Sequence, residues 1–522
     1  MPPDSPYERP AVTPPVEQWP CTVWSAASGS LAALRRSARS ALLRTALQYR
    51  RFLCTVAENC EISLTHAEWP VASPETTPLV MTGHQPVIFH SGLTFKYETT
   101  EQFIIDHQAL GLAVMIDTDE GDAGEFSFPV AEFSDSDSAP TRRHTETASF
   151  SQGPGLFLNS QLGTRAHRDA VVARVLQALS AAEQHDAAHA FSRTSAIYSR
   201  FSPSSMAVAN TIVRQAAGIG NRLLEIPLSA LCRLPEVIRF FSDILSRPRK
   251  FHECYNQVLS QFRKDHSIRN DANPFPNLHT DTDGFELPFW LVHPASGTRS
   301  ILWLRNHQHT PWLCKDQQPV TELHPGMAGE ALLALMAQGW LLVPRGALIT
   351  ASLRLLFSDL FVHGLGGGRY DPATDQLIRA WWQEEPSPFV VASASRCLFP
   401  EDRLRLLQMR QFQTQLRDLQ FNPGRYLNQQ LFPVSVEEQL QSLLAEKEAA
   451  VCLLQQHRDT GGSGKDAGRH IQKLSDTIRS LVTSTLQPQI DTLNQLSPQT
   501  ISTIESRLWP WFFFANTPSP MP

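Results

Sequence analysis

The stretch PLVMTGHQPVIFHSGLTFKYETTEQFIIDHQALGLAVMID, residues 78–117, decides which class of fold the sequence predicts. It begins with a short apolar run, passes through a turn rich in His, Gln and Gly, and then reads as a helix from about Ser91 to His107. A second apolar run, GLAVMID, follows that helix. Strand, turn, helix and strand in this order form a βαβ unit, the building block of a parallel sheet. We therefore expect an α/β protein.

Bulk properties exclude several classes of protein. A chain of 522 residues is too long for one compact core, so two or three structural units are expected. Charged residues make up 18% and the formal net charge is −6, which gives no general attraction to nucleic acid or to an anionic membrane. The eight cysteines are dispersed without a C-x-x-C pair, and no apolar run is long enough to span a bilayer. These features predict a cytoplasmic protein with reduced thiols and no metal knuckle.

Changes in composition and periodicity divide the chain into seven expected segments. They are a disordered Pro-rich tail (1–20), an N-terminal helical segment (21–74), the first part of the α/β core (75–130), a mostly helical insertion with a β-hairpin (131–328), the second part of the core with a Gly-rich loop (329–400), a helical coiled-coil arm (401–496) and a C-terminal segment (497–522). We expect both parts of the core to share one sheet.

The arm differs in kind from the rest of the chain. Two apolar-periodic helices are joined by a Gly/Ser-rich turn, and their spacing predicts an antiparallel coiled-coil hairpin over about Val434 to Leu496. One seam is expected to hold Leu440, Leu444, Val451 and Leu454, facing Ile471, Leu474, Ile478 and Leu481. Such an arm more often supports a core or a homodimer than it carries catalysis.

The turn from His84 to His90, called the opening turn below, is the first candidate site. The loop after the first strand of a βαβ unit lies at the carboxyl edge of the sheet, where ligands normally bind. Gly83 and Gln85 accompany the two histidines, which could donate hydrogen bonds to an anion, while Lys96 could add a point charge. The alternative is that both histidines are structural and bond to nearby carbonyl groups.

The second candidate, called the acidic strand end below, follows the second strand in MIDTDEGDAGEF. It holds Asp117, Asp119, Glu120 and Asp122. It is not an EF-hand, because the required glycine is out of register and a strand precedes it instead of a helix. These carboxylates could bind an amino group, sugar hydroxyls or Mg²⁺. A solvated acidic turn is the alternative interpretation.

The third candidate is the glycine run of FVHGLGGGRYDPATDQLI, which holds Gly364, Gly366, Gly367 and Gly368. Asp371 and Pro372 follow it and are typical of a helix start. The run is neither a P-loop nor a dinucleotide motif, because no Lys-Ser/Thr follows and Arg369 stands at the third glycine position. We expect a flexible loop whose backbone can approach a ligand closely. A helix C-cap would explain Gly364 but not four glycines.

Three blocks occur together in an order that resembles one family. They are TGHQPVIFHSGLTFKY, the acidic end after AVMIDTDEGD, and PRGALITASLRLLFSDLFVHGLGGGRYDPATD, followed by the late helical hairpin. This pattern resembles the cysteine-adding enzymes of bacillithiol biosynthesis (BshC). The resemblance implies a Rossmann-like core related to nucleotidylyl transferases and class I synthetases, and a coiled coil that mediates dimerisation. It also implies addition of cysteine to the amine of glucosaminyl-malate.

The expected function is therefore a ligase that joins an amino acid such as cysteine to the amine of a small sugar-derived acceptor. The alternative is a non-catalytic dimeric protein of the same fold that binds a nucleotide or metabolite. We expect His84, His90, Asp119 and Asp122 to act in catalysis, with the other polar residues and glycines of the three candidates binding ligand. The resemblance alone brings the glycine run into the same pocket. The cofactor is left open between ATP, another nucleotide and Mg²⁺, and no protein metal centre is expected.

Overall fold

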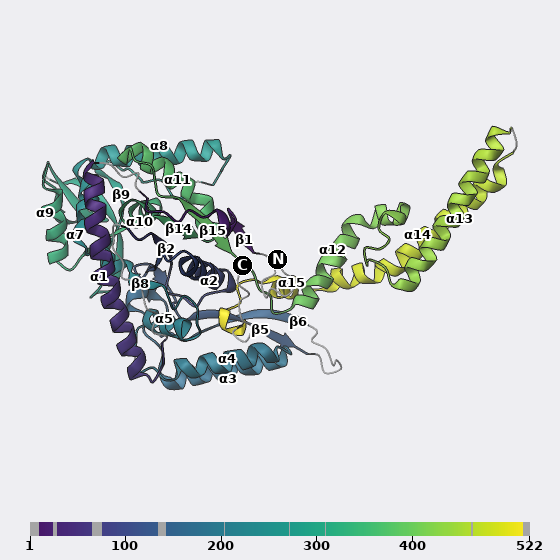
Figure 1. Cartoon of the computed structure of the whole chain (residues 1–522), viewed down its shortest axis with the longest axis horizontal. Coiled ribbons are helices and arrows are strands. Elements are labelled where there is room, and N and C mark those ends of the chain that lie inside the picture. Colours follow the sequence, from purple (N-terminus) through teal and green to yellow (C-terminus); the bar gives the residue numbers. More distant parts are fainter. Residues whose placement is uncertain are drawn as a thin grey trace. The chain divides into compact units, whose positions relative to one another are not determined.

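The computed structural model describes residues 10–24, 29–64, 76–133, 142–202, 204–270, 272–307, 309–460 and 463–514 of the chain. The fold is mixed α/β and contains a sheet of parallel strands (Figure 1). The chain divides into two compact units. The main unit comprises Met1–Phe128, Glu146–Arg396 and Arg507–Pro522, and the arm unit comprises Pro129–Thr145 and Cys397–Ser506.

The central sheet of the main unit has six strands in the order β1-β15-β14-β2-β3-β8. Their bounds are Ala11–Thr13, Phe389–Ser393, Leu360–His363, Leu79–His84, Leu110–Met115 and Leu224–Pro227, respectively. All neighbours are parallel except β1, which runs antiparallel to β15. Counted along the chain, the parallel strands lie in the order third, second, first, fourth, fifth from β8 to β15. The strand order thus reverses between β2 and β14.

Helices cover both faces of this sheet. Helix α2 (Ser91–Asp106) packs against β2, β3, β14 and β15. The opposite face packs on α1 (Gly29–Asn59), α10 (Ala347–Leu356) and α11 (Leu365–Trp382), because Leu79 and Met81 share one buried cluster with residues of these helices. The long helix α1 also lies against β8 (Figure 1). Burial on both faces explains why β2 and β3 read as nearly continuous apolar runs.

A second, antiparallel sheet belongs to the same hydrophobic core. Its order is β12-β11-β10-β9-β13, with bounds Gln318–Glu322, Thr310–Lys315, Thr298–His307, Gly284–His293 and Leu341–Pro344. The β-hairpin expected within residues 131–328 is confirmed as β9 and β10. The remaining elements of the main unit are α3 (Arg165–Ala181), α4 (His185–Tyr198), α5 (Met206–Ala216), α6 (Leu228–Leu231), α7 (Pro235–Ser246), α8 (Pro248–Asp265) and α9 (Ala328–Ala337). A short strand pair β4–β7 (Glu120–Gly121, Gly155–Leu156) also belongs to the main unit, whereas β5 (Glu125–Glu132) and β6 (Arg142–Ser149), which pair with each other, each continue from one unit into the other.

The expected division of the core was right in one respect and wrong in two. Strands from both predicted core parts, β2 and β3 with β14 and β15, do share one sheet. However, β8 comes from the predicted insertion, and β13 from the second core part joins the other sheet. Both errors have one cause: an apolar run predicts a strand, but its pairing partner is set by distant segments that the run itself does not specify.

The N-terminal region is also corrected. Residues 1–9 of the predicted disordered tail lie outside the described residues, but β1 forms within that tail and pairs with β15. The Trp19 side chain is buried, and its indole N–H donates to the Pro14 carbonyl at 2.9 Å. The physical reason is that β15 would otherwise present an unpaired edge, which β1 covers.

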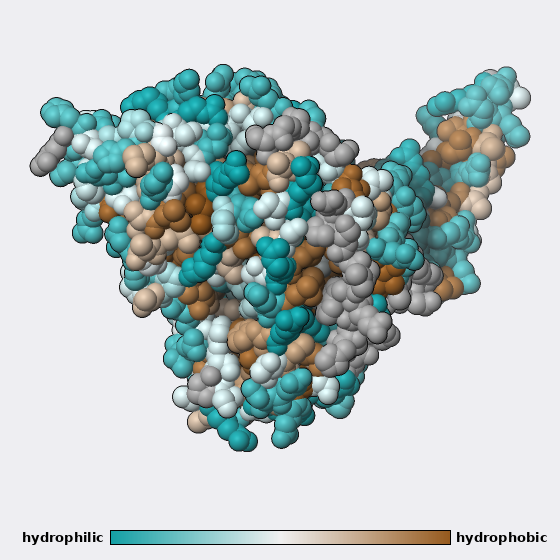
Figure 2. Space-filling view, turned by 60° about the vertical axis from the view of Figure 1, so that its left-hand side comes forward, coloured by the Kyte–Doolittle hydropathy of each residue, from teal (hydrophilic) through white to brown (hydrophobic). Residues whose placement is uncertain are grey.

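In the arm unit, α14 (Lys465–Gln495) packs against both α12 (Pro400–Phe421) and α13 (Val434–Asp459), and α15 (Pro498–Glu505) follows. Leu440 and Ile478 of the predicted seam are buried. Val451 was predicted wrongly, because it is 47% exposed and Ala450, one residue earlier, is buried instead. Hydrophobic side chains are visible on the surface of this unit in Figure 2. Among all described residues, no helix combines the length and apolar character needed to cross a membrane.

Candidate functional site

The opening turn lies at the carboxyl edge of the central sheet. His84 is the last residue of β2 and pairs with Met115 at the end of β3, and His90 is the N-cap of α2. Glycine is required just before the turn, because a Cβ on Gly83 would lie 2.7 Å from the carbonyl oxygen of Val114. The predicted strand, turn and helix around this motif are therefore confirmed.

A hydrogen bond joins the opening turn to the acidic strand end. Gln85 Nε2 donates to Asp119 Oδ2 at 2.9 Å, and the other oxygen of Asp119 pairs with Arg299 of β10. Burial alone would raise the pKa of Asp119, but its contacts with Gln85 and Arg299 hold that pKa below the ordinary value. Asp119 is consequently ionised at neutral pH. A third of its side chain is exposed, so it can still accept a hydrogen bond from a ligand.

The other carboxylates of the acidic strand end organise the protein locally. Asp117 is buried, accepts hydrogen bonds from the backbone and hydroxyl of Ser229, and has its pKa raised to about 6 by burial. Asp122 accepts from one backbone N–H and from two serine hydroxyl groups. Glu120 is exposed in the short strand β4. These three contacts satisfy Oδ1 of Asp122 and give it a structural role, while its expected catalytic role stays a prediction.

His90 also has a structural role that the sequence left open. Its Nδ1 accepts a hydrogen bond from the Gly92 backbone N–H at 3.0 Å and so caps α2. This contact requires an unprotonated Nδ1, and burial together with the charge of Lys96 lowers the pKa of His90. His90 was expected to donate a hydrogen bond to an anion, and with Nδ1 occupied by the cap, Nε2 is the ring nitrogen left for that contact within the described part of the chain.

The opening turn and α2 enclose a basic cluster made of His84, His90 and Lys96. Lys96 is only 2% exposed, and its Nζ donates to the Gly83 carbonyl at 2.8 Å. Burial lowers the pKa of Lys96 to about 7. Burial, followed by the nearby Lys96 charge, lowers the pKa of His84 to about 3, so His84 is neutral at physiological pH. Within the described part of the chain, Lys96 forms no ion pair with a carboxylate.

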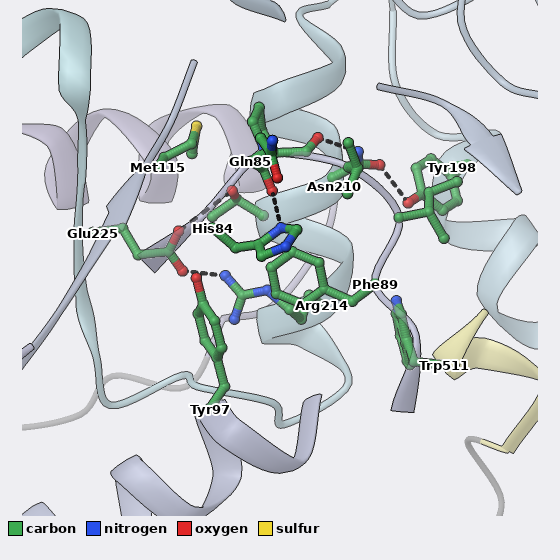
Figure 3. A pocket seen from close by; sticks show the side chains of 14 residues that line it. His84, Gln85, Phe89, Tyr97, Met115, Tyr198, Asn210, Arg214, Glu225 and Trp511 are labelled. Atoms are coloured by element: carbon green, nitrogen blue, oxygen red, sulfur yellow. Dashed lines mark hydrogen bonds and ion pairs between the residues drawn. The ribbon is translucent and has the colours of Figure 1, made fainter. Parts of the chain in front are cut away.

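A layer of polar side chains supports the opening turn from behind (Figure 3). Asn210 Nδ2 donates to the carbonyl oxygens of Pro86 and Ala123, each at 2.8 Å, and thereby ties the opening turn to the acidic strand end. The Asn210 side chain accepts in turn from the Tyr198 hydroxyl at 2.7 Å. This layer comes from α4 and α5, within the segment predicted to be a separate insertion.

Arg214 of α5 completes that layer. Its guanidinium pairs with Glu225 of β8 and lies over the rings of Phe89 and Tyr97. These buried residues were missed by the sequence reasoning. The available signal was the segment MAVANTIVRQA, where Asn210 and Arg214 interrupt an otherwise apolar helix, because a buried polar residue is more informative than a buried apolar one.

The cavity that these residues line is small. About 20 Å³ is open to the centre of a water molecule, which is enough for one ordered water and not for a substrate. Its lining includes His84, Gln85, Asn210 and also Trp511 of the C-terminal segment, whose backbone N–H donates to the Phe89 carbonyl at 2.8 Å. The cavity is therefore part of the support of the opening turn.

The sequence predicted that the glycine run is a flexible loop, and this prediction is wrong. The run forms the start of α11. Helix α11 begins at Leu365, so Asp371 and Pro372, predicted to start it, lie inside it. This earlier start depends on glycine at two positions. A Cβ at Gly367 would lie 2.4 Å from His363 Nδ1, and a Cβ at Gly368 would lie 2.2 Å from a side-chain atom of Val391, so any other residue would clash. Glycine at these two positions lets the first turn pack tightly against β14 and β15.

The three candidates share one edge of the sheet but not one pocket. The glycine run follows β14, which is the neighbour of β2, so it lies at the same carboxyl edge as the opening turn. None of its residues lines the cavity behind the opening turn. The expected meeting of the opening turn with the acidic strand end is confirmed by the Gln85–Asp119 contact, whereas the glycine run forms a separate feature next to them.

Comparison with known proteins gave no assignment. No family model matches the chain, and no curated protein matches it. Among the described residues, no group of three or more His, Cys, Asp or Glu side chains is arranged so that it could hold a metal ion. The function must therefore be inferred from the geometry and from the resemblance of the three sequence blocks.

Proposed function

We propose that the central sheet is a Rossmann-like nucleotide-binding core. The observation that carries this proposal is the strand order, in which the five parallel strands run third, second, first, fourth, fifth from β8 to β15. In sheets of this kind ligands bind outside the carboxyl ends of the strands, at the point where the order reverses. That point lies between β2 and β14, next to the opening turn and the glycine run.

At this edge we propose a ligase of the bacillithiol cysteine-adding type, joining an amino acid such as cysteine to the amine of a small sugar-derived acceptor. The support is that all three blocks carrying the family resemblance lie at the ends of β2, β3 and β14. A bound nucleotide would supply activation of the amino acid carboxylate. The protein itself supplies the positive charge of Lys96 and the acceptor Asp119, which suit an anionic group and an ammonium group, respectively.

The proposal is tested by turnover. The purified protein is incubated with cysteine and glucosaminyl-malate, with and without ATP, and product is followed by mass spectrometry. We expect Asp119→Asn to lower turnover at least tenfold, because it removes an anionic acceptor at the proposed site. Asp281→Asn is the matched control, since it removes a comparable carboxylate–guanidinium pair with Arg305 in the second sheet. Equal turnover by both variants would exclude the assigned site.

A second function, binding of a nucleotide or metabolite without reaction, is favoured by one observation. His90 serves as the cap of α2 and His84 is neutral, so the histidines expected to stabilise a transition state have little charge to offer. Nucleotide binding without any turnover of the cysteine and amine substrates would identify this function. In that case His84→Ala should change the affinity for the nucleotide, and neither the wild type nor the variant should show turnover.

We also propose that α13 and α14 form an antiparallel coiled coil that mediates a homodimer. Several apolar side chains of α13 are exposed, among them Val434, Val451 and Leu453. The double variant Val451→Glu, Leu453→Glu should give a monomer in light scattering. The control is Leu404→Glu, an exposed apolar residue of α12, which should leave the dimer intact. A dimer that persists in the double variant would contradict the assigned interface.

A further inference from the structure

Two arginines at the second sheet stack on tryptophan rings but differ in their partners. The Cζ atom of Arg305, in β10, lies 4.1 Å from the centre of the Trp303 ring, and that of Arg345, directly after β13, lies 4.4 Å from the centre of the Trp290 ring. Arg305 donates to both carboxylate oxygens of Asp281, at 2.9 and 2.8 Å, and to a backbone carbonyl group at 2.8 Å. The Arg305 guanidinium is therefore satisfied within the protein.

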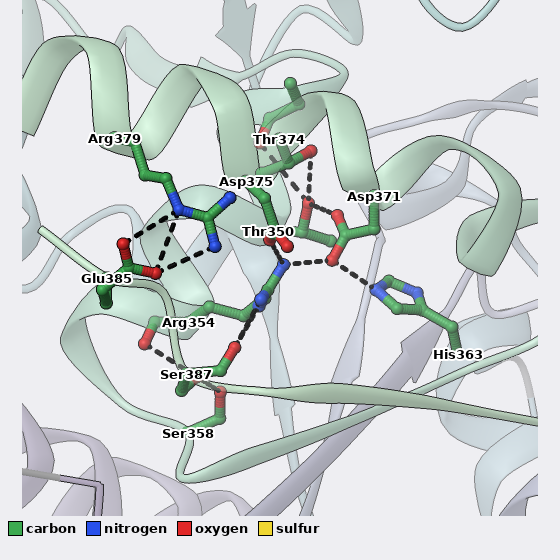
Figure 4. Close-up of polar contacts among 11 residues, drawn as sticks. Thr350, Arg354, Ser358, His363, Asp371, Thr374, Asp375, Arg379, Glu385 and Ser387 are labelled. Carbon is green, nitrogen blue, oxygen red and sulfur yellow. Dashed lines mark hydrogen bonds and ion pairs between the residues drawn. The ribbon is translucent and has the colours of Figure 1, made fainter. Parts of the chain in front are cut away.

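Arg345 has no such set of partners. Its side chain is 14% exposed, and its Nη1 is buried without a hydrogen-bond partner among the described residues. The ion pair with Glu286 spans 3.7 Å, which is beyond hydrogen-bond distance. By contrast, the buried guanidinium of Arg354 donates to Asp371 at 2.6 Å and to the Ser387 carbonyl at 2.8 Å (Figure 4). Because buried donors without acceptors cost free energy, Arg345 fits an acceptor supplied by a ligand.

A second guanidinium lies over the same tryptophan. The Cζ atom of Arg299 is 3.9 Å from the centre of the Trp290 ring, and its Nη1 pairs with Asp119. The Nε of Arg299 is buried without a partner within the described part of the chain. Burial is the main cause that lowers the pKa of Arg345, and the nearby charge of Arg299 adds to this lowering. Arg299 and Arg345, called the arginine pair below, thus place two like charges beside one ring.

The backbone holds Arg345 in a fixed position. Its N–H donates to the Pro288 carbonyl of β9 at 2.9 Å. Gly346, the next residue, has φ 52°, and a Cβ there would lie 2.9 Å from the ring of Phe275. The guanidinium is therefore presented by a rigid segment, as a binding group that must be in place before its ligand arrives requires.

The location of the arginine pair favours a carboxylate over the phosphates of a nucleotide. Through Asp119 and Gln85 the pair is joined to the opening turn on the side of β3. The strand order reverses on the other side of β2, next to β14, and a nucleotide is expected there. Guanidinium groups bind a carboxylate through two parallel hydrogen bonds.

We propose that the arginine pair binds a carboxylate group of a substrate through its unused N–H groups, next to Asp119. This inference rests on the proposed ligase function, in which the amino acid and glucosaminyl-malate both carry carboxylates. It adds the place where a carboxylate of one of them is held, which is the face of the second sheet at Trp290.

The experiment measures binding to the full-length protein by calorimetry. Cysteine and glucosaminyl-malate are the carboxylate ligands, cysteamine and glucosamine are their counterparts without a carboxylate, and pyrophosphate is a different anion. Arg345→Lys keeps the positive charge beside Glu286 but loses the planar fork of donors. It should weaken cysteine, glucosaminyl-malate or both about tenfold, and leave the other three ligands within about twofold. The ligand that is weakened identifies the source of the carboxylate.

Arg305→Lys is the matched control. It makes the same substitution at an arginine that also stacks on a tryptophan of the second sheet, but whose donors are used by Asp281 and a backbone carbonyl group. All five affinities should stay within about twofold of the wild type. A variant that fails to fold would lose every ligand, so the comparison of cysteine with cysteamine separates a lost contact from a lost fold.

The outcomes also separate this inference from the proposed function. If the wild type turns over cysteine and glucosaminyl-malate, and Arg345→Lys leaves the affinity and KM of both unchanged, the inference is wrong and the ligase function stands. If pyrophosphate is weakened as much as the carboxylate ligands, or cysteamine as much as cysteine, the assignment of a carboxylate is overturned. If the wild type neither binds nor turns over the two substrates at millimolar concentration, both proposals fail.

Discussion

Two buried charges at opposite ends of the central sheet have very different surroundings. Asp359, just before β14, accepts hydrogen bonds from the guanidinium groups of Arg35 and Arg39 and from the backbone N–H groups of Trp24 and Leu79, all within 2.9 Å. Among the described residues, Lys96 at the carboxyl edge has one hydrogen-bond acceptor, the Gly83 carbonyl, and its Nζ lies 5.6 Å from the centre of the Tyr97 ring.

The difference indicates which end of the sheet serves stability and which serves binding. A buried charge with a full set of partners holds the fold together, whereas a buried charge with almost none is costly unless a ligand completes it. Asp359 ties α1 and the N-terminal segment to the starts of β2 and β14. Lys96 lies beneath the turn that carries the family resemblance.

The largest effect is expected at the amino end of the sheet. Asp359→Asn removes the anion and leaves Arg35 and Arg39 buried without a counter-charge, so the free energy of unfolding should fall by about 3–5 kcal/mol. Urea denaturation measures this change. Glu146→Gln, which breaks the exposed pair with Arg174, should cost less than about 1 kcal/mol. If both variants lose a similar free energy of unfolding, the buried contacts of Asp359 do not stabilise the fold more than an exposed ion pair does.

Lys96→Met should raise the free energy of unfolding, whereas Asp359→Asn lowers it. Replacing a buried, poorly partnered ammonium by an apolar side chain of similar length should raise stability by about 1–4 kcal/mol. The pKa of Lys96 is about 7 in the folded protein and 10.5 in the unfolded chain, so the unfolded state binds more protons between these values. The cost of burying Lys96 is then full below pH 7 and disappears as the pH rises to 10.5.

The advantage of Lys96→Met over the wild type should therefore be larger at pH 6 than at pH 9.5, as measured by thermal unfolding. ADP binding should weaken in the same variant if Lys96 contributes its charge to the ligand. A difference in melting temperature that is independent of pH would show that Lys96 is not buried as a titrating amine.

Asn210→Ala tests the support of the opening turn. Losing the amide leaves the buried carbonyl groups of Pro86 and Ala123 without their donor, which should cost about 1–3 kcal/mol. Hydrogen exchange of the opening turn should become faster. Asn256→Ala is the control, because the Asn256 amide also satisfies backbone groups, donating to the Leu278 carbonyl and accepting from the Leu278 N–H, but away from the turn. Faster exchange in both variants would mean that the turn responds to global stability alone.

The smallest effect concerns the cap of α2. His90→Ala should lower the free energy of unfolding by about 1 kcal/mol, and His90→Asn should restore most of it, since asparagine is a good N-cap. Chemical denaturation of both variants provides the measurement. If asparagine restores stability but ligand binding stays impaired, the Nε2 atom of His90 contacts the ligand and the site is larger than the cap.

Local pattern was sufficient for the elements that begin the fold. The βαβ unit of β2, α2 and β3, the β9–β10 hairpin and the two long helices of the arm unit were predicted because their apolar spacing follows the period of each element. Local pattern misled at Asp371 and Pro372, which resemble a helix start but lie inside α11, since Asp371 serves as the partner of Arg354 and His363. An ion pair across elements is invisible to a rule that considers only neighbouring residues.

By itself, the sequence determined the class of fold and the location of the opening turn and acidic strand end at one edge of a parallel sheet, because side-chain periodicity and chain order suffice for both. Only the tertiary structure decided that β8 completes the sheet, that Asn210 and Arg214 support the opening turn, that His90 caps a helix, and that Lys96 is left almost without partners. The physical reason is that burial and the count of polar partners are properties of packing between segments far apart in the chain.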